Sequence, residues 1–120
     1  MACPLFLPSA PLAGFSDFYA GECSAGVGGS IPEATLRQCC NAGYARGVCE
    51  RAAQSDADAF RFTIKANQDR VVDVAWSSER NHHPVAVGIL TVSVTAPADT
   101  SPLERQARIY AAAFLSQIGA

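Results

Sequence analysis

Hydrophobic and polar residues alternate along the second half of the chain, which is the pattern of half-buried β-strands. From Ala59 the alternation predicts a first strand, FRFTIK, at residues 60–65. A turn at Asn67–Asp69 then leads to a second strand over Arg70–Ser77, and the two strands are expected to form a hairpin. After a loop over Ser78–Pro84, β-branched and apolar residues predict a third strand over Val85–Val94. The economical topology is a three-stranded antiparallel meander.

A C-terminal helix is expected after this meander. Ser101 and Glu104 have the spacing of a capping box, and Pro102 suits the first turn of a helix. Apolar side chains then follow helical spacing at Leu103, Ala107, Tyr110, Ala111, Phe114 and Ile118. We expect this helix to cover one face of the sheet. Residues 57–120 would then form a small unit that packs together with the first half of the chain, because so short a unit buries a modest fraction of its surface.

The first half of the chain, residues 1–52, has a different character. Residues 1–32 contain four of the seven prolines and five of the nine glycines, so we expect loop there rather than a backbone ladder. Ser30 and Glu33 form a second capping signature, which predicts a helix that runs to about Ala42 and stops at Gly43. A further short turn is expected over Tyr44–Arg51. The predicted fold class is therefore α+β, with a loop and helix segment preceding the meander and the final helix.

Composition and charge exclude several classes of function. The 120 residues suit one domain rather than a large multi-domain enzyme, and 49% of them are hydrophobic, which is enough for a packed core. The net charge of -2 lacks the basic excess of nucleic-acid-binding proteins. No basic residue precedes Arg37, and prolines interrupt the first apolar stretch, so neither an export signal nor a membrane span is expected. We therefore expect a cytoplasmic protein.

The cysteines carry most of the information about chemistry. All of them lie in the first 49 residues, at Cys3, Cys23, Cys39, Cys40 and Cys49. In a reducing compartment, clustered thiols indicate metal ligands or redox groups rather than disulfides. None of the spacings is the C-x-x-C of zinc ribbons, so number and clustering are more informative than spacing. Four thiolates on one centre would order a segment rich in loops, because metal-binding free energy becomes folding free energy.

Of the vicinal pair, one cysteine is expected to be spare, because neighbouring side chains on a helix diverge by about 100°. Both Cys39 and Cys40 share a helix face with Leu36, so periodicity does not choose between them. Four cysteinates around zinc and four around an oxidised [4Fe-4S] core both carry a charge of about -2. The flanking residues Arg37, Arg46 and Arg51 could stabilise either centre, or could be a solvated helix face.

The cysteine motifs resemble those of a family. In chain order they are CPL at residues 3–5, ECSA at residues 22–25, CNAGY at residues 40–44 and finally Cys49. This order resembles a set of small bacterial four-cysteine proteins that are thought to hold an iron-sulfur cluster. The resemblance covers about the first 50 residues. It implies a cluster bound by Cys3, Cys23, Cys40 and Cys49, with Cys39 left over, and it implies no defined reaction.

Other chemistry is weakly supported by the sequence. His82 and His83 lie near serines and Glu79, but without a G-x-S-x-G elbow they suggest a solvated connection rather than a hydrolase. Enzymatic activity is thus not favoured. We expect a small iron-sulfur protein with a role in electron transfer, redox sensing or structural support, together with a protein partner. The alternatives are a zinc-stabilised interaction module, or a metal-free domain in which the cysteines are structural.

Overall fold

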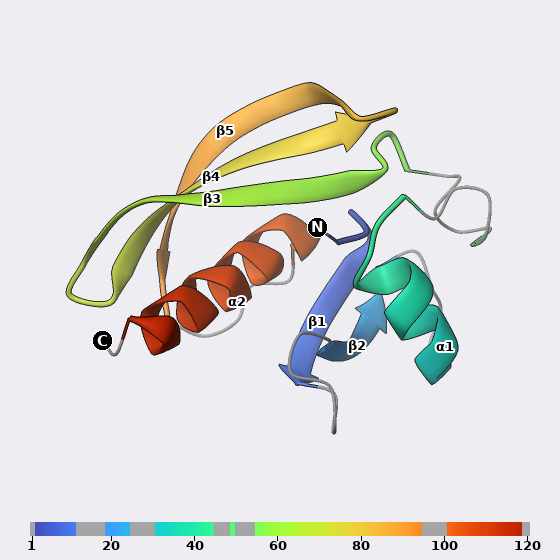
Figure 1. Cartoon of the computed structure of the whole chain (residues 1–120), viewed down its shortest axis with the longest axis horizontal. Coiled ribbons are helices and arrows are strands. Elements are labelled where there is room, and N and C mark those ends of the chain that lie inside the picture. The colour runs from blue at the N-terminus through green and yellow to red at the C-terminus, as the bar shows by residue number, and fades with distance from the viewer. Residues whose placement is uncertain are drawn as a thin grey trace.

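A computed structural model of the chain describes residues 2–11, 19–24, 31–44, 49, 55–94 and 101–118. The architecture is α+β, as the sequence predicts. A three-stranded sheet packs against the C-terminal helix, and a two-stranded sheet with a short helix lies beyond the N-terminal end of that helix (Figure 1). The Ser30 cap, most of the turn predicted at Tyr44–Arg51 and the linker before Ser101 lie outside the described residues.

The three-stranded sheet is the predicted meander. Its strands are β3 (Ala59–Gln68), β4 (Val71–Arg80) and β5 (His83–Ser93), all antiparallel and in chain order. Asp69 and Arg70 connect β3 to β4 with positive φ angles of 53° and 64°. This is the backbone of a two-residue hairpin turn, whose twist matches that of the strands. The turn lies slightly later than the predicted Asn67–Asp69.

The predicted loop over Ser78–Pro84 is wrong. Strand β4 continues to Arg80, and β5 begins at His83. A second tight turn, Asn81–His82, joins them with φ angles of 52° and 66°. Asparagine tolerates this left-handed conformation better than most residues, which makes so short a connection possible. The polar residues before the turn therefore belong to a strand, although they look like loop in the sequence.

The final helix, α2 (Pro102–Gln117), begins as the sequence predicts. The Ser101 hydroxyl accepts a hydrogen bond from the Glu104 backbone N–H at 3.4 Å, and Pro102 occupies the first turn. The helix packs on the sheet through one apolar cluster, whose buried members are Val72, Val74, Ala107, Ala111 and Leu115. Two residues expected on the buried face are exposed, Tyr110 at 42% and Ile118 at 53%. Leu115 is buried there instead, so the face is rotated from the predicted one.

The N-terminal segment corrects the expectation of loop. Strands β1 (Phe6–Pro11) and β2 (Tyr19–Cys23) form an antiparallel two-stranded sheet. Prolines argue against a central strand, but in a two-stranded sheet both strands are edges, and a missing N–H on the outer side costs nothing. In the pairing, Phe6 lies opposite Cys23, which brings two distant parts of the N-terminal half together.

The predicted cysteine helix is present, with an unusual last turn. It comprises α1 (Glu33–Thr35) and η1 (Leu36–Cys40), a single turn of π-helix closed by the Asn41 N–H on the Leu36 carbonyl at 2.9 Å. Gly43 follows with a φ of +72°, as expected for a residue that ends a helix. Such π-turns occur frequently at functional sites.

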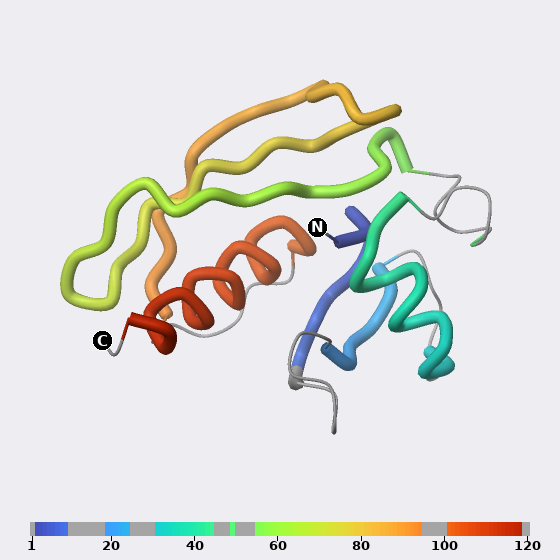
Figure 2. Tube along the Cα trace, in the orientation of Figure 1, coloured from blue at the N-terminus to red at the C-terminus, as the bar shows by residue number. Residues whose placement is uncertain are grey.

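A second buried cluster forms here, made of Cys3, Phe6, Leu36, Cys39 and Cys40. The N-terminal half thus has an apolar core of its own. It is joined to the sheet by the Phe60 N–H, which donates to the Ala2 carbonyl at 3.0 Å, and to α2, whose first turns lie beside the start of β1 (Figure 2). In the described part of the chain, no helix is long and apolar enough to cross a membrane.

The Ser101 cap can be tested by substitution. Ser101→Ala removes the acceptor of the Glu104 N–H and is expected to lower the free energy of unfolding by about 1 kcal/mol in urea titrations. Ser116→Ala is the matched control, because Ser116 is exposed in the same helix. Equal stability of the two variants would show that the cap contributes nothing.

Candidate functional site

The five cysteines gather at one end of the molecule. Cys3, Cys39 and Cys40 are buried together in the N-terminal core, with exposed fractions of 8%, 4% and 8%, and Cys49 packs against them. Cys23 is half-buried at the end of β2, opposite Phe6 of the same core. All five are free thiols. Residues that are up to 46 positions apart in the sequence therefore supply sulfur atoms to one neighbourhood.

A tight backbone turn positions Cys3. The Phe6 N–H donates to the Cys3 carbonyl at 3.0 Å, which closes the turn over Cys3–Phe6. The Cys3 N–H donates to the Cys40 carbonyl at 3.0 Å, so this turn is fixed directly to the end of the cysteine helix. On the other side, the Ser24 N–H donates to the Leu5 carbonyl at 2.7 Å and holds the residue after Cys23 against the same turn.

Asn41 fixes the cysteine helix to β2. Its side-chain oxygen accepts from the Tyr19 N–H at 2.9 Å, and its amide nitrogen donates to the Tyr19 carbonyl at 2.9 Å and to the Leu36 carbonyl at 2.8 Å. One side chain therefore pairs with a strand as another strand would, while it also satisfies a carbonyl of the π-turn. These bonds link the helix that carries Cys39 and Cys40 to the strand that carries Cys23.

The buried thiols strongly favour their protonated form. Burial raises the pKa of Cys40 to about 12, and repulsion from the other four cysteines adds to the effect. Burial also raises the pKa of Cys3, partly offset by a hydrogen bond from the Leu5 backbone, and repulsion from Cys23, Cys49 and Cys39 raises it further. Without a cation the cluster is thus a neutral core. A metal ion bound there would have to displace protons.

The two vicinal cysteines differ in their surroundings. Cys40 interacts electrostatically with each of the four other thiols, Cys3 most strongly and Cys23 next. The pKa of Cys39 is raised mainly by burial, with a further contribution from Cys49. Cys39 in turn acts on both Cys3 and Cys40, so what distinguishes the two is that Cys23 acts on Cys40 and is not among the causes of the raised pKa of Cys39. The sequence pattern could not separate the two residues, because this difference arises from the tertiary packing.

The sulfur atoms are not arranged around one point as the ligands of a metal ion would be. Among the described residues, no group of three or more His, Cys, Asp or Glu side chains is arranged to hold a metal ion. Of the flanking arginines, Arg37 is exposed on the cysteine helix, whereas Arg46 and Arg51 lie outside the described residues. The structure thus places the five thiols in one cluster without placing them in ligand geometry.

A separate polar cluster fastens the sheet to the end of the cysteine segment. The Glu79 carboxylate is buried and accepts from the Arg61 guanidinium at 2.7 Å and from the Tyr44 hydroxyl. These two hydrogen bonds, Arg61 first, lower the pKa of Glu79. His82 stacks on the Tyr44 ring with centroids 4.4 Å apart. Each of these groups has a partner within the protein, which indicates that the cluster has a structural role.

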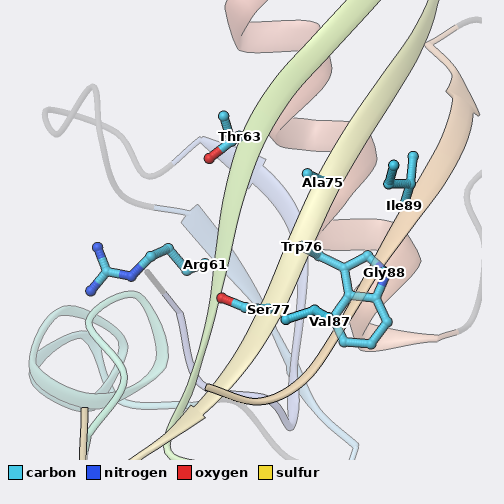
Figure 3. A pocket seen from close by; sticks show the side chains of 8 residues that line it. All are labelled: Arg61, Thr63, Ala75, Trp76, Ser77, Val87, Gly88 and Ile89. Carbon is cyan, nitrogen blue, oxygen red and sulfur yellow. The ribbon is translucent and has the colours of Figure 1, made fainter. Parts of the chain in front are cut away.

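The exposed face of the large sheet carries an open hollow of about 370 Å³. Figure 3 shows that side chains from three neighbouring strands line it, among them Arg61, Trp76 and Val87. Val85, Val87 and Ile89 on this face are all more than half exposed. The charged lining residue, Arg61, is already engaged by Glu79. The cysteine cluster is therefore the better candidate for a functional site.

Two residues important to the site have no signal in the sequence that sets them apart. Asn41 and Gln106 both look like ordinary polar residues of a helix or its end. Gln106 is in fact buried, and its side-chain amide donates to the Cys3 carbonyl at 2.8 Å and to the Phe6 carbonyl at 2.9 Å. Only the tertiary structure shows that a residue more than 100 positions away contacts the Cys3 turn.

The Glu79 cluster predicts a pH dependence of stability. Because the folded-state pKa of Glu79 lies below its ordinary value of 4.5, the carboxylate stabilises the fold above that pH, and this stabilisation is lost as pH falls through the lowered pKa. In urea titrations, the deficit of Glu79→Gln relative to the unmodified protein should be largest near pH 6 and should shrink as the pH is lowered below 4.5. Glu22→Gln, at an exposed position, is the control. A deficit that does not change with pH would contradict the assignment.

Comparisons of this chain with protein-family models, with curated proteins and with solved structures found no match. No relative therefore supplies a function or a ligand set. What the protein does has to be inferred from its own residues, and above all from the cysteine cluster.

Proposed function

We propose that the protein binds an iron-sulfur cluster of the [4Fe-4S] type through Cys3, Cys23, Cys40 and Cys49. The observation that supports the proposal most is the convergence of the thiols. Three of the five are buried in one core, a fourth packs against it, and Cys23 acts electrostatically on two of them. Five free thiols gathered in and around one small core would be an unusual use of residues selected only for their apolar character.

The chemistry of the donor set fits such a group. Thiolate sulfur is the preferred ligand of iron-sulfur clusters and of zinc, and four ligands complete either site. The Leu5 backbone donates a hydrogen bond to the Cys3 sulfur, and hydrogen bonds of this kind tune the potential of a cluster. When bound, the cluster would supply one-electron redox chemistry. The cysteines would hold it, and the apolar side chains of Phe6 and Leu36 would keep water away.

Binding would require the four ligands to lose their protons and to close on a common centre. The free energy of the new metal–sulfur bonds would have to exceed the cost of deprotonating buried thiols, of which Cys40 is the most resistant. Affinity should accordingly rise with pH. Cys39, which lies next to Cys40 and is not one of the four proposed ligands, would remain a free thiol.

The role proposed for this centre is electron transfer, redox sensing or structural support in the cytoplasm, with a protein as the partner. The α2 helix and the large sheet would act as the scaffold or the docking surface. We do not propose nucleic acid or membrane as a partner, since the net charge is -2 and the described part of the chain has no spanning helix.

The decisive test is the metal content of native protein. The full chain, purified without oxygen, is expected to be brown, to contain iron and acid-labile sulfide in near-equal amounts, and to bleach on oxidation. Colourless protein with one zinc per chain would replace the proposal by a zinc-stabilised interaction module. Protein without either metal, whose folding is insensitive to chelators, would refute both.

Serine substitutions test the assignment of ligands. Cys23→Ser and Cys49→Ser are each expected to lose most of the bound metal, because serine is a poor ligand for soft metals. Cys39→Ser is the matched control, since it alters the neighbouring thiol of the same core and should keep the metal. Iron and zinc are measured by elemental analysis of each purified variant. Equal metal content in all three variants would overturn the assignment.

A further inference from the structure

A buried glutamine connects the C-terminal helix to the cysteine cluster. Gln106 lies in the first turns of α2 and is only 5% exposed. Its side-chain nitrogen donates to the carbonyls of Cys3 and Phe6, at 2.8 and 2.9 Å. These are the first and last residues of the turn that carries the Cys3 sulfur. One amide group therefore spans the turn and holds both of its ends.

A glutamine at this buried position also carries a free-energy cost. The Gln106 side-chain oxygen is buried and has no hydrogen-bond partner among the described residues. An unsatisfied buried acceptor typically costs about 1–3 kcal/mol, which an apolar residue of the same length would avoid. A glutamine at this position is thus poorly explained by stability, whereas its two donated hydrogen bonds are specific to the Cys3 turn.

We infer that Gln106 is a positioning residue for the Cys3 ligand, and that it couples the metal-bound state of the cluster to the docking of α2. This inference rests on the proposed function. Residues that orient metal ligands from outside the coordination sphere typically change metal affinity by about 10- to 100-fold. By reciprocity, a metal held by Cys3 would strengthen the attachment of α2 to the N-terminal half.

The test compares Gln106→Met with Gln117→Met in the full chain. Methionine keeps the length of the side chain but donates no hydrogen bond, and Gln117 is an exposed glutamine of the same helix. In anaerobic cobalt(II) titrations followed by the sulfur-to-cobalt charge-transfer band, Gln106→Met should bind about 10- to 100-fold more weakly than the unmodified protein. Its metal-free urea midpoint is measured in parallel, so that the loss of the two hydrogen bonds to the turn is separated from the loss of cobalt affinity. Equal cobalt affinity in Gln106→Met and Gln117→Met would overturn the inference.

A second measurement needs no metal and separates this inference from the proposed function. In metal-free protein, iodoacetamide should modify Cys3 several-fold faster relative to Cys40 in Gln106→Met than in Gln117→Met, as read by mass spectrometry of the peptides. An unchanged ratio would overturn the positioning role. If the unmodified protein binds no cobalt while the ratio still changes, the metal site fails and the positioning of the Cys3 turn stands.

A third measurement uses the unmodified protein, in case Gln106→Met does not fold. On addition of zinc, the side-chain amide resonances of Gln106 should shift and exchange more slowly with solvent, whereas those of Gln117 should not. Zinc that binds without moving the Gln106 resonances would contradict the coupling between the cluster and α2.

Discussion

The packing of the N-terminal half against α2 depends on the backbone turn from Cys3 to Phe6. Three separate elements hold it: the Cys40 carbonyl at the end of the cysteine helix, the Ser24 N–H beyond β2, and the Gln106 amide of α2. Each contact is a hydrogen bond to the backbone, so each fixes position rather than adding apolar area. If this turn were released, the N-terminal core would lose its connection to α2 and the cysteines would lose their common orientation.

Burial gives the thiols two opposed properties. The neutral thiols pack as small apolar groups, and with Phe6 and Leu36 they give the N-terminal half a core that does not require a metal. The same burial raises the pKa of Cys3, Cys39 and Cys40, so forming thiolates there is costly unless a cation compensates. A cluster of this kind is stable while its thiols are protonated. Once the thiols lose their protons, a tightly bound soft metal ion would compensate the buried negative charge.

The sequence predicts those parts of the fold that depend on local periodicity. The alternation in β3, the capping residues of α2 and the meander order are all visible in it, because each depends on neighbouring residues. The sequence does not predict the N-terminal hairpin, since Pro8 is typical of a strand breaker until both strands are known to be edges. The Asn81–His82 turn cannot be located from the sequence, because it lies within a continuous run of polar residues. Gln106 cannot be found by periodicity at all, because its value lies in contacts with Cys3 and Phe6, roughly a hundred residues away.

The central claim is that sulfur atoms from across the first half of the chain bind one inorganic centre. X-ray absorption spectroscopy at the edge of whichever metal accompanies the native protein tests it most directly. The account predicts a first shell made of sulfur alone, with four protein thiolates in total and metal–sulfur distances of about 2.3 Å. A first shell that contains nitrogen or oxygen in place of sulfur, or a native protein without any bound metal, would contradict it.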